Sequence, residues 1–246
     1  MLDIFRSLFA PPRDMILILA ALWLGLSLAE RRVSRHGISK EALNNLVFYS
    51  LLGFVLGGRL LFAMEHLQIF MRSPLSLISP NIDLFDPVGA LVTAILVGLI
   101  YGRRQSLPLW PTLDALTPFF AALAIGIHLS HLAAGTAFGS PTDLPWGIEL
   151  WNSVRHPTQV YELLASFLIF GYLWFSKPGL FAGSDFLLFT ALTAGSRLLF
   201  EAFRGDSALI LNGIRSTQLI AWLVLAAALI ASEILRARYK AASQIN

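Results

Sequence analysis

The sequence contains no cysteine and few charged residues. The absence of cysteine from its 246 residues excludes disulfide bonds, cysteine–zinc sites and a cysteine nucleophile of the chain's own. Any thiol chemistry must therefore use a thiol that a substrate brings. Charged residues make up 13% of the chain, which is about half of the roughly 25% found in soluble domains. A soluble globular protein is therefore not expected.

Hydrophobic residues are abundant instead. They make up 56% of the sequence, and the mean hydropathy is +0.69. The formal net charge of +3 is small, so we interpret the basic residues as anchors at a membrane surface rather than as a nucleic-acid-binding patch. The composition indicates an integral membrane protein with no nucleic-acid partner.

Several apolar segments are candidates for membrane-spanning helices. A bilayer core about 30 Å thick requires about 20 mostly apolar residues in a helix. We therefore predict an all-α, polytopic membrane protein with about seven transmembrane helices, in a single integral membrane domain of residues 1–246. Asp86 is expected to be the N-cap of the third span. The expected spans are Met15–Leu28, Leu46–Met64, Pro87–Tyr101, Leu113–Ala134, Pro157–Phe175, Asp185–Phe203 and Thr217–Leu235.

The positions of lysine and arginine in the loops predict the orientation. About ten of these residues fall on one side of the membrane and about six on the other, and the richer side is expected to be cytoplasmic. The N-terminus would then lie outside and the C-terminus inside. The longer loops would form an elaborated outer face, periplasmic or extracellular. Residues 1–14 form a candidate interfacial element, and residues 236–246 are predicted to be a cytoplasmic tail.

Three ionisable residues lie at the end of the sixth expected span, the last of them directly after it. Arg197, Glu201 and Arg204 are spaced by four and three positions in SRLLFEAFR, so they share one face of a helix. Ionisable groups at membrane depth are costly and usually face a protein interior or a wet cavity. Two cations beside one carboxylate suit the binding of an anionic lipid headgroup. They equally suit a structural ion network in which the three side chains pair only with one another.

Further polar residues gather at the expected outer boundary of the membrane. The segment RHPTQVYE places five polar residues at the start of the fifth span: Arg155, His156, Gln159, Tyr161 and Glu162. They would contact a substrate, or else form an interfacial helix cap with its tyrosine in the aromatic belt. Arg59, which follows two glycines in GFVLGGRLLF, is either a cationic subsite for a lipid phosphate or a side chain that extends to the interface.

Two histidines lie three positions apart near the outer end of the fourth span. His128 and His131, in HLSHLAAGTAF, would share a helix face. They would line a polar cavity, with acid–base or phosphate contacts, or they would be packed histidines that share hydrogen bonds. A metal site needs three or four ligands, and neither an HExxH motif nor a carboxylate at ligand spacing accompanies them. We therefore expect no metal ion.

Several segments occur in an order and spacing that resemble a known family. RHPTQVYE is close to that family's RHPSQLYE, and LVFYSLLGFVLGGRLLFAME resembles its second span with the Gly-Gly-Arg step. SRLLFEAFRGDS resembles its late arginine motif, and STQLIAWLVL resembles its closing span. The family is that of the prolipoprotein diacylglyceryl transferases. The resemblance extends from about Leu46 to Leu225, and RHPTQVYE is its most specific part.

This resemblance implies a multi-pass enzyme of the bacterial plasma (inner) membrane, with its site toward the outer leaflet. Such enzymes transfer diacylglyceryl from phosphatidylglycerol to the lipobox cysteine of a prolipoprotein, forming a thioether and releasing glycerol phosphate. The expected partners are therefore phosphatidylglycerol or a similar anionic phospholipid, the signal-peptide segment of a prolipoprotein, and the membrane. Neither a cofactor nor a metal ion is expected.

The polar residues above are the candidates for this site. We expect the catalytic residues to be His128, His131 and Arg197. Within the site, Arg197 and Arg204 would bind phosphate and Glu201 would orient them. The residues expected to bind substrate are Arg59, Arg155, His156, Gln159, Tyr161, Glu201 and Arg204.

The sequence departs from the family at several motif positions. Aligned on Gly135, the family's arginine falls on His128 and its asparagine on His131, while its His-Gly-Gly segment falls on Asp86–Pro87–Val88. The two histidines would then supply the missing cation or base. The alternative is a non-catalytic, lipid-binding or complex-forming membrane subunit derived from that family.

Overall fold

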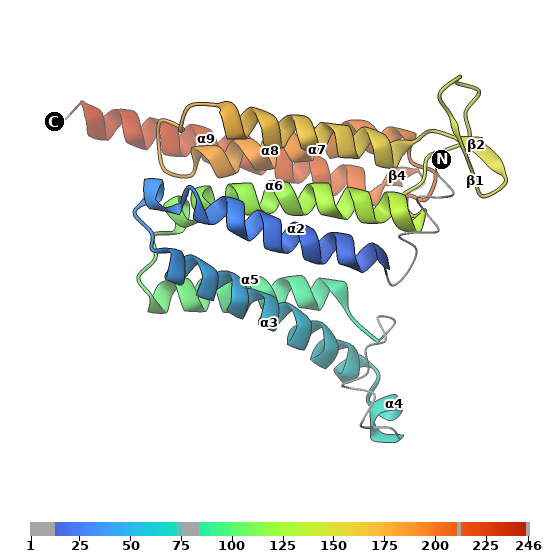
Figure 1. Cartoon of the computed structure of the whole chain (residues 1–246), viewed down its shortest axis with the longest axis horizontal. Helices are drawn as coiled ribbons and strands as arrows, with labels where there is room; N and C mark the ends of the chain where they lie inside the picture. Colours follow the sequence, from blue (N-terminus) through green and yellow to red (C-terminus); the bar gives the residue numbers. More distant parts are fainter. Residues whose placement is uncertain (1–12, 73, 75–83, 211–212, 245–246) are drawn as a thin grey trace. The chain divides into compact units, whose positions relative to one another are not determined.

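Helices make up most of the structure, a computed structural model that describes residues 13–72, 74, 84–210 and 213–244 (Figure 1). The helices are α2 Arg13–Glu30, η1 Val33–His36, α3 Lys40–Glu65, α4 Leu67–Arg72, α5 Pro87–Arg104, α6 Leu109–Ala134, α7 Thr158–Phe175, α8 Ser184–Phe200, η3 Glu201–Phe203 and α9 Ser216–Ser243. The strands are β1 Ile148–Leu150, β2 Ser153–Arg155, β3 Leu209–Ile210 and β4 Ile214–Arg215. The all-α prediction is confirmed. Most of the candidate interfacial element, residues 1–14, lies outside the described residues.

Six of the described helical segments are long and apolar enough to cross a membrane: α3, α5, α6, α7, α8 with η3, and α9. The first expected span corresponds to α2, an apolar helix of 18 residues whose sequence has Arg13, Asp14 and Glu30 at its ends. The prediction of a polytopic membrane protein is confirmed. α9 continues to Ser243, through most of the segment predicted to be a tail, because the alanines, arginines and lysine there favour a helix.

The described residues form two compact units. One contains the residues up to Arg32 together with those from Leu113 onward, and the other runs from Val33 to Thr112. Each unit packs its own helices. The single integral membrane domain of residues 1–246 stays a prediction.

In the unit of residues 33–112, α3 packs along α5 through a face of small residues. A Cβ atom at Gly53 would lie 2.9 Å from a methyl carbon of Val97, and one at Gly57 would overlap the side chain of Thr93. Without those atoms the two backbones approach closely. Such small-residue faces are a common means of helix association in lipid, where no hydrophobic driving force acts between helices.

The N-cap side chains of α3 and α5 explain where these two helices start. The Ser39 hydroxyl accepts a hydrogen bond from the Ala42 N–H at 3.1 Å. The Asp86 carboxylate accepts from the N–H groups of Val88 and Gly89 at 3.0 and 2.9 Å. Both satisfy N–H groups that the first turn of a helix leaves unpaired. The predicted N-cap role of Asp86 is confirmed.

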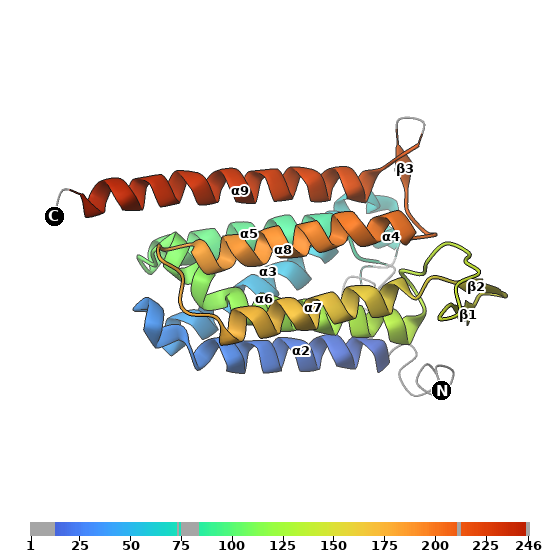
Figure 2. The ribbon, with the colours of Figure 1, turned by 90° about the horizontal axis from the view of Figure 1, so that it is seen from above.

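The other unit is built from α2 and the helices α6 to α9. α8 packs against both α7 and α9 (Figure 2). α2 and α6 approach closely, since a Cβ atom at Gly25 would lie 2.9 Å from the carbonyl oxygen of Phe119. The helices α6 to α9 run in alternating directions (Figure 2), as in other polytopic bundles.

Two charged side chains fix helix ends within this unit. Asp114, which is buried on α6, accepts hydrogen bonds from the N–H groups of Gly183 and Phe186 at 2.6 and 2.9 Å, at the start of α8. Arg32 donates to backbone carbonyls at the end of α7, and its guanidinium lies 3.9 Å from the ring centre of Trp174. An acid at a helix N-terminus and a cation at a C-terminus both stabilise the helix dipole.

The two short hairpins lie at the end of this unit where α6 ends and α7 begins (Figure 2). β1 pairs with β2 through a two-residue turn in which Trp151 and Asn152 have φ values of 54° and 59°, as a type I′ turn requires. The indole of Trp151 donates to the carbonyl of Gly135 at 3.1 Å. This end therefore contains the loops that follow α6 and α8.

We expect Gly57→Ala to destabilise the unit of residues 33–112 by about 1–3 kcal/mol, because the new methyl group overpacks the face against Thr93. Gly102→Ala is the matched control, since no atom lies within 4 Å of a Cβ atom placed there, and it should be neutral or slightly stabilising. Thermal unfolding of the purified protein in detergent measures both. Equal unfolding temperatures of the two variants would contradict this account of the packing.

Candidate active site

The loop that follows α6 is held against the start of α7. The Thr158 hydroxyl donates to the carbonyl of Ala137 at 2.7 Å, and the Gln159 amide donates to the carbonyl of Thr136 at 2.8 Å. Thr158 and Gln159 are almost completely buried. The polar residues of RHPTQVYE thus satisfy backbone carbonyls that would otherwise be buried without partners.

The same loop is also held against the end of α8. Ser140 donates its N–H to the carbonyl of Phe203 at 2.8 Å, and Gly205 donates its N–H to the carbonyl of Phe138 at 2.9 Å. Gly139 and Gly205 permit this approach, because a Cβ atom at Gly205 would lie 2.7 Å from the carbonyl oxygen of Gly139. The loop therefore joins the ends of three helices.

Glu162, on α7, lies at the centre of a buried ion network. Its side chain is only 2% exposed. One carboxylate oxygen, Oε1, forms an ion pair with Nη1 of Arg197 on α8 and lies 3.7 Å from Nη1 of Arg204. The other oxygen, Oε2, lies 3.3 Å from Nδ1 of His128 on α6. A single carboxylate therefore connects two helices of the bundle to its own.

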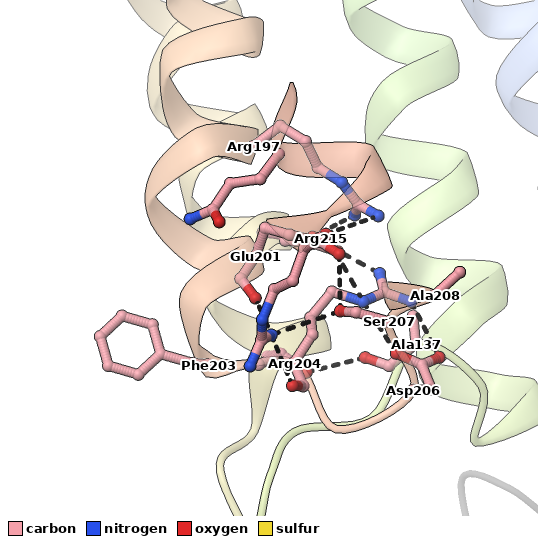
Figure 3. A network of polar contacts seen from close by, with 12 residues as sticks. Ala137, Arg197, Glu201, Phe203, Arg204, Asp206, Ser207, Ala208 and Arg215 are labelled. Carbon is pink, nitrogen blue, oxygen red and sulfur yellow. Dashed lines mark hydrogen bonds and ion pairs between the residues drawn. The ribbon is translucent and has the colours of Figure 1, made fainter. Parts of the chain in front are cut away.

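Glu201 forms the second centre of the network (Figure 3). Its Oε2 atom lies 3.1 Å from Nη2 of Arg197 and 3.9 Å from Nε of Arg204. Its Oε1 atom accepts a hydrogen bond from the Ser207 hydroxyl at 2.6 Å. Glu201 therefore contacts both Arg197 and Arg204, as expected for three residues that share one helix face.

Asp206 and Arg215 complete the network beyond η3 (Figure 3). Arg204 forms a bidentate pair with Asp206, with N–O distances of 2.9 and 2.8 Å. Arg215 donates to the backbone carbonyls of Glu201 and Arg204. The network thus has equal numbers of arginines and carboxylates, and their formal charges cancel. These groups are Arg197, Arg204, Arg215, Glu162, Glu201 and Asp206.

Several members of the network are partly exposed. The Arg197 side chain is 27% exposed, the Asp206 side chain 24% and the His128 side chain 15%, whereas both glutamates are almost completely buried. A ligand that reaches Arg197 and His128 would therefore meet guanidinium and imidazole nitrogens, with the two glutamates behind them. This arrangement suits an anionic ligand.

The two histidines on α6 lie side by side. Their ring centres are 6.0 Å apart. One ligand atom from each, together with a carboxylate oxygen of Glu162, lie within 4.8 Å of one another. Nδ1 of His128 faces the Glu162 carboxylate, whereas Nδ1 of His131 is buried without a hydrogen-bond partner among the described residues. The structure thus brings to the histidines a carboxylate from α7, whereas the one acid of their own helix, Asp114, is bonded at the start of α8.

Arg155 holds the loop that follows α6. Its Nε atom donates to the carbonyl of Leu150 at 3.0 Å and its Nη1 atom to the carbonyl of Gly139 at 3.2 Å. Its guanidinium lies 5.0 Å from the ring centre of Phe138. These contacts stabilise the loop and the β1–β2 hairpin.

His156 and Tyr161 pack beside the loop. The His156 ring centre lies 5.2 Å from that of Phe203, and the Tyr161 hydroxyl accepts a hydrogen bond from the Trp146 indole at 2.8 Å. Arg59 belongs to the unit of residues 33–112, where it donates to the carbonyl of Leu84 at 2.9 Å.

Several members of the network were not among the site residues expected from the sequence: Glu162, Asp206, Ser207 and Arg215. Glu162 closes RHPTQVYE, and Asp206 follows the late arginine motif directly, so the motifs contained a signal for both. Arg215 has none, because only the pairing of β3 with β4 brings it back to the carbonyls at the end of α8 and η3.

Comparison with known proteins assigns the chain to a family. The sequence model of the family described as prolipoprotein diacylglyceryl transferase matches residues 15–233. The chain belongs to this family. The resemblance predicted from RHPTQVYE and the late arginine motif is therefore confirmed.

Relatives of the chain are named phosphatidylglycerol–prolipoprotein diacylglyceryl transferase. One from Clostridium tetani (strain Massachusetts / E88) is 27% identical over 188 residues, which cover 73% of this chain and 75% of the relative. One from Trichormus variabilis is 26% identical over 223 residues, or 83% and 78%. One from Bordetella parapertussis is 33% identical over 182 residues, or 65% and 69%. The family and these names indicate a diacylglyceryl transferase enzyme.

We expect Glu162→Gln to destabilise this family member by about 3 kcal/mol, because it removes the buried negative charge that Arg197, Arg204 and His128 face and leaves the three arginines of the network with two carboxylates. Glu233→Gln is the control, since that carboxylate is 74% exposed in its pair with Arg236, and it should change stability by less than about 0.5 kcal/mol. Thermal unfolding in detergent compares the two. Similar unfolding temperatures would show that the Glu162 pairs contribute little.

Proposed function

We propose that the chain transfers diacylglyceryl from phosphatidylglycerol, or a similar anionic phospholipid, to the lipobox cysteine of a prolipoprotein. The observation that carries this proposal is the joining of Arg197, Arg204 and His128 by the buried carboxylate of Glu162. It unites phosphate-binding cations with a base, in a chain whose family is named for this transfer.

In the proposed reaction, the sulfur of the acceptor thiol attacks the carbon of the diacylglyceryl group that is bonded to a phosphate oxygen. A sulfur–carbon bond forms and the carbon–oxygen bond to the phosphate breaks. The thiol proton passes to a base, and the electron pair of the broken bond stays on the phosphate oxygen. The products are a thioether and glycerol phosphate. The absence of cysteine from the chain is consistent with this reaction, because the substrate supplies the thiol.

Arg197 and Arg204 are the proposed phosphate ligands. Arginine is always charged and offers paired donors that match phosphate oxygens. Arg197 is partly exposed, while Glu201 contacts both guanidinium groups and fixes their positions. Positioned cations that meet the charge developing on a leaving phosphate lower the barrier to its departure.

His128 is the proposed base, and His131 is its neighbour in the site. A free cysteine thiol has a pKa of about 8.5, so it needs help to become the nucleophilic thiolate. The Glu162 carboxylate, 3.3 Å from Nδ1 of His128, would orient the imidazole and stabilise the imidazolium that forms. The other ring nitrogen would accept the thiol proton.

The other expected site residues keep substrate-binding roles in this proposal. Arg155 and Gln159 would act through the loop that follows α6, which their hydrogen bonds hold. His156 and Tyr161 would shape the outer mouth beside that loop. Within its own unit, residues 33–112, Arg59 would be a cationic subsite for a lipid phosphate.

A non-catalytic, lipid-binding or complex-forming subunit is the second candidate. It is favoured by the histidines at 128 and 131, where the family's motif has an arginine and an asparagine. An imidazole lacks the permanent charge and paired donors of a guanidinium. Such a subunit would bind phosphatidylglycerol without consuming it.

An assay with labelled phosphatidylglycerol and a lipobox peptide tests the proposal. The purified protein should form the thioether product, and His128→Ala should slow the reaction by about 10²–10⁴-fold as expected for loss of a general base. Arg103→Ala, at the exposed end of α5, is the control and should retain full activity. A folded protein that binds the lipid and forms no product would favour the non-catalytic subunit, as would failure to restore lipoprotein modification in cells depleted of their own enzyme.

We also propose that the protein lies in the bacterial plasma membrane with its N-terminus outside and its C-terminus in the cytoplasm. The cysteine-free chain is a ready background for accessibility labelling. A cysteine at exposed Asp143 should react with a membrane-impermeant maleimide in intact cells, and a cysteine at exposed Lys177 should react only after permeabilisation. The reverse pattern would contradict the orientation.

A further inference from the structure

The fold places a third potential metal ligand, a carboxylate from α7, beside the two histidines of α6. We propose that His128, His131 and Glu162 form a binding site for a zinc ion. The histidines come from α6 and the carboxylate from α7, and one ligand atom from each lies within 4.8 Å of the others. No carboxylate near the histidines in the sequence could serve, which is why the site is visible only in three dimensions.

The spacing of the ligand atoms suits zinc. Tetrahedral zinc lies about 2.0–2.1 Å from imidazole nitrogen and carboxylate oxygen, which places neighbouring ligand atoms roughly 3.3 Å apart. Nδ1 of His128 and Oε2 of Glu162 are 3.3 Å apart. The His131 ring is the remaining ligand; its ligand atom lies within 4.8 Å of the other two and would have to move closer to them for a zinc ion to bind.

One proposed ligand is a buried polar atom without a partner. Nδ1 of His131 is buried and accepts or donates no hydrogen bond within the described residues, and buried polar atoms of this kind require an explanation. Nδ1 of His128 and Oε2 of Glu162 contact only each other at 3.3 Å on this side. In the histidine tautomers protonated at Nε2, each Nδ1 atom carries a lone pair, and a cation bound between the three atoms would be contacted by all of them.

The other carboxylate oxygen of Glu162 is held by a partner of its own, as the groups that bind metal ions in proteins usually are. Oε1 pairs with Arg197, so the carboxylate is held in place while Oε2 faces the histidines. Hydrogen bonds behind a ligating carboxylate orient it toward the metal. Arg197 and Arg204 repel a cation, and Glu201 and Asp206 offset that repulsion by pairing with them.

The ligand set is one that suits zinc, and it leaves one coordination position free. Two imidazole nitrogens and one carboxylate oxygen are a ligand set that zinc binds, and with three protein ligands the fourth position takes water or substrate. Softer sites rich in thiolates are excluded because the chain has no cysteine.

The free coordination position suggests a role for the zinc ion in activating the acceptor thiol, and this role rests on the proposed function. The acceptor thiol would displace the water and bind zinc as thiolate, with its proton released to solvent. Metal coordination favours the thiolate form, so zinc would replace His128 as the means of ionising the thiol. The ion would also add positive charge beside the departing phosphate.

Metal binding by the purified, full-length protein tests the site directly. After treatment with a chelator, the protein in detergent is dialysed against zinc and its metal content is measured by mass spectrometry. We expect one zinc ion per chain, and tetrahedral cobalt absorption when cobalt replaces zinc. His131→Ala should weaken zinc binding by at least about tenfold. His66→Ala, an exposed histidine in the other unit, is the matched control and should bind like the wild type.

Two results would overturn the site: wild-type protein that binds no stoichiometric zinc, or folded His131→Ala that binds it as tightly as His66→Ala. Because binding is measured without substrate, this failure is separate from that of the proposed function. Transfer of lipid by a protein that binds no zinc would reject the site and keep the function. Stoichiometric zinc on a protein inert in the transfer assay would reject the function and keep the site. If chelator-treated enzyme transfers lipid at an unchanged rate, the thiol-activating role is wrong.

Discussion

The pairing of the buried Glu162 carboxylate with Arg197 is the interaction on which the rest of this unit depends. A carboxylate that is 2% exposed would cost several kcal/mol to bury alone. Arg197 on α8 and His128 on α6 approach it from two sides. The three helices must therefore meet at this depth, and their packing is specified by a charge requirement as well as by apolar contact.

The loops at this end of the unit follow from the same constraint. The segment between Gly135 and Ser140 lies against α7 and the end of α8, so its backbone carbonyls are removed from water. Buried backbone groups need partners, and Thr158 and Arg155 supply them. The polar residues of RHPTQVYE thus build the wall of the site, while Glu162 at its end enters the site itself.

The charge balance of the network also bears on its function. In the absence of ligand, the carboxylates neutralise the arginines, which makes the buried cluster tolerable. An incoming phosphate competes with those carboxylates for the guanidinium groups, and partly exposed Arg197 is the one best placed to exchange partners. A zinc ion at Oε2 of Glu162 would relieve this competition, because it would hold the carboxylate while Arg197 turns to the phosphate. The metal and the anion would then support each other's binding.

Local sequence was enough for the elements and for part of the site. Runs of apolar residues predicted the helices, and Asp86 predicted the start of α5. The spacing of Arg197, Glu201 and Arg204 placed these residues on one helix face. Each of these signals acts within a few residues of the chain, so it can be recognised in the sequence alone. The contact between His128 and Glu162, the return of Arg215 to Glu201, and the capping of α8 by Asp114 join residues from different helices. Spacing along one helix reveals only neighbours on that helix. Tertiary packing alone decided that two histidines without a nearby acid in the sequence would share a carboxylate with two arginines.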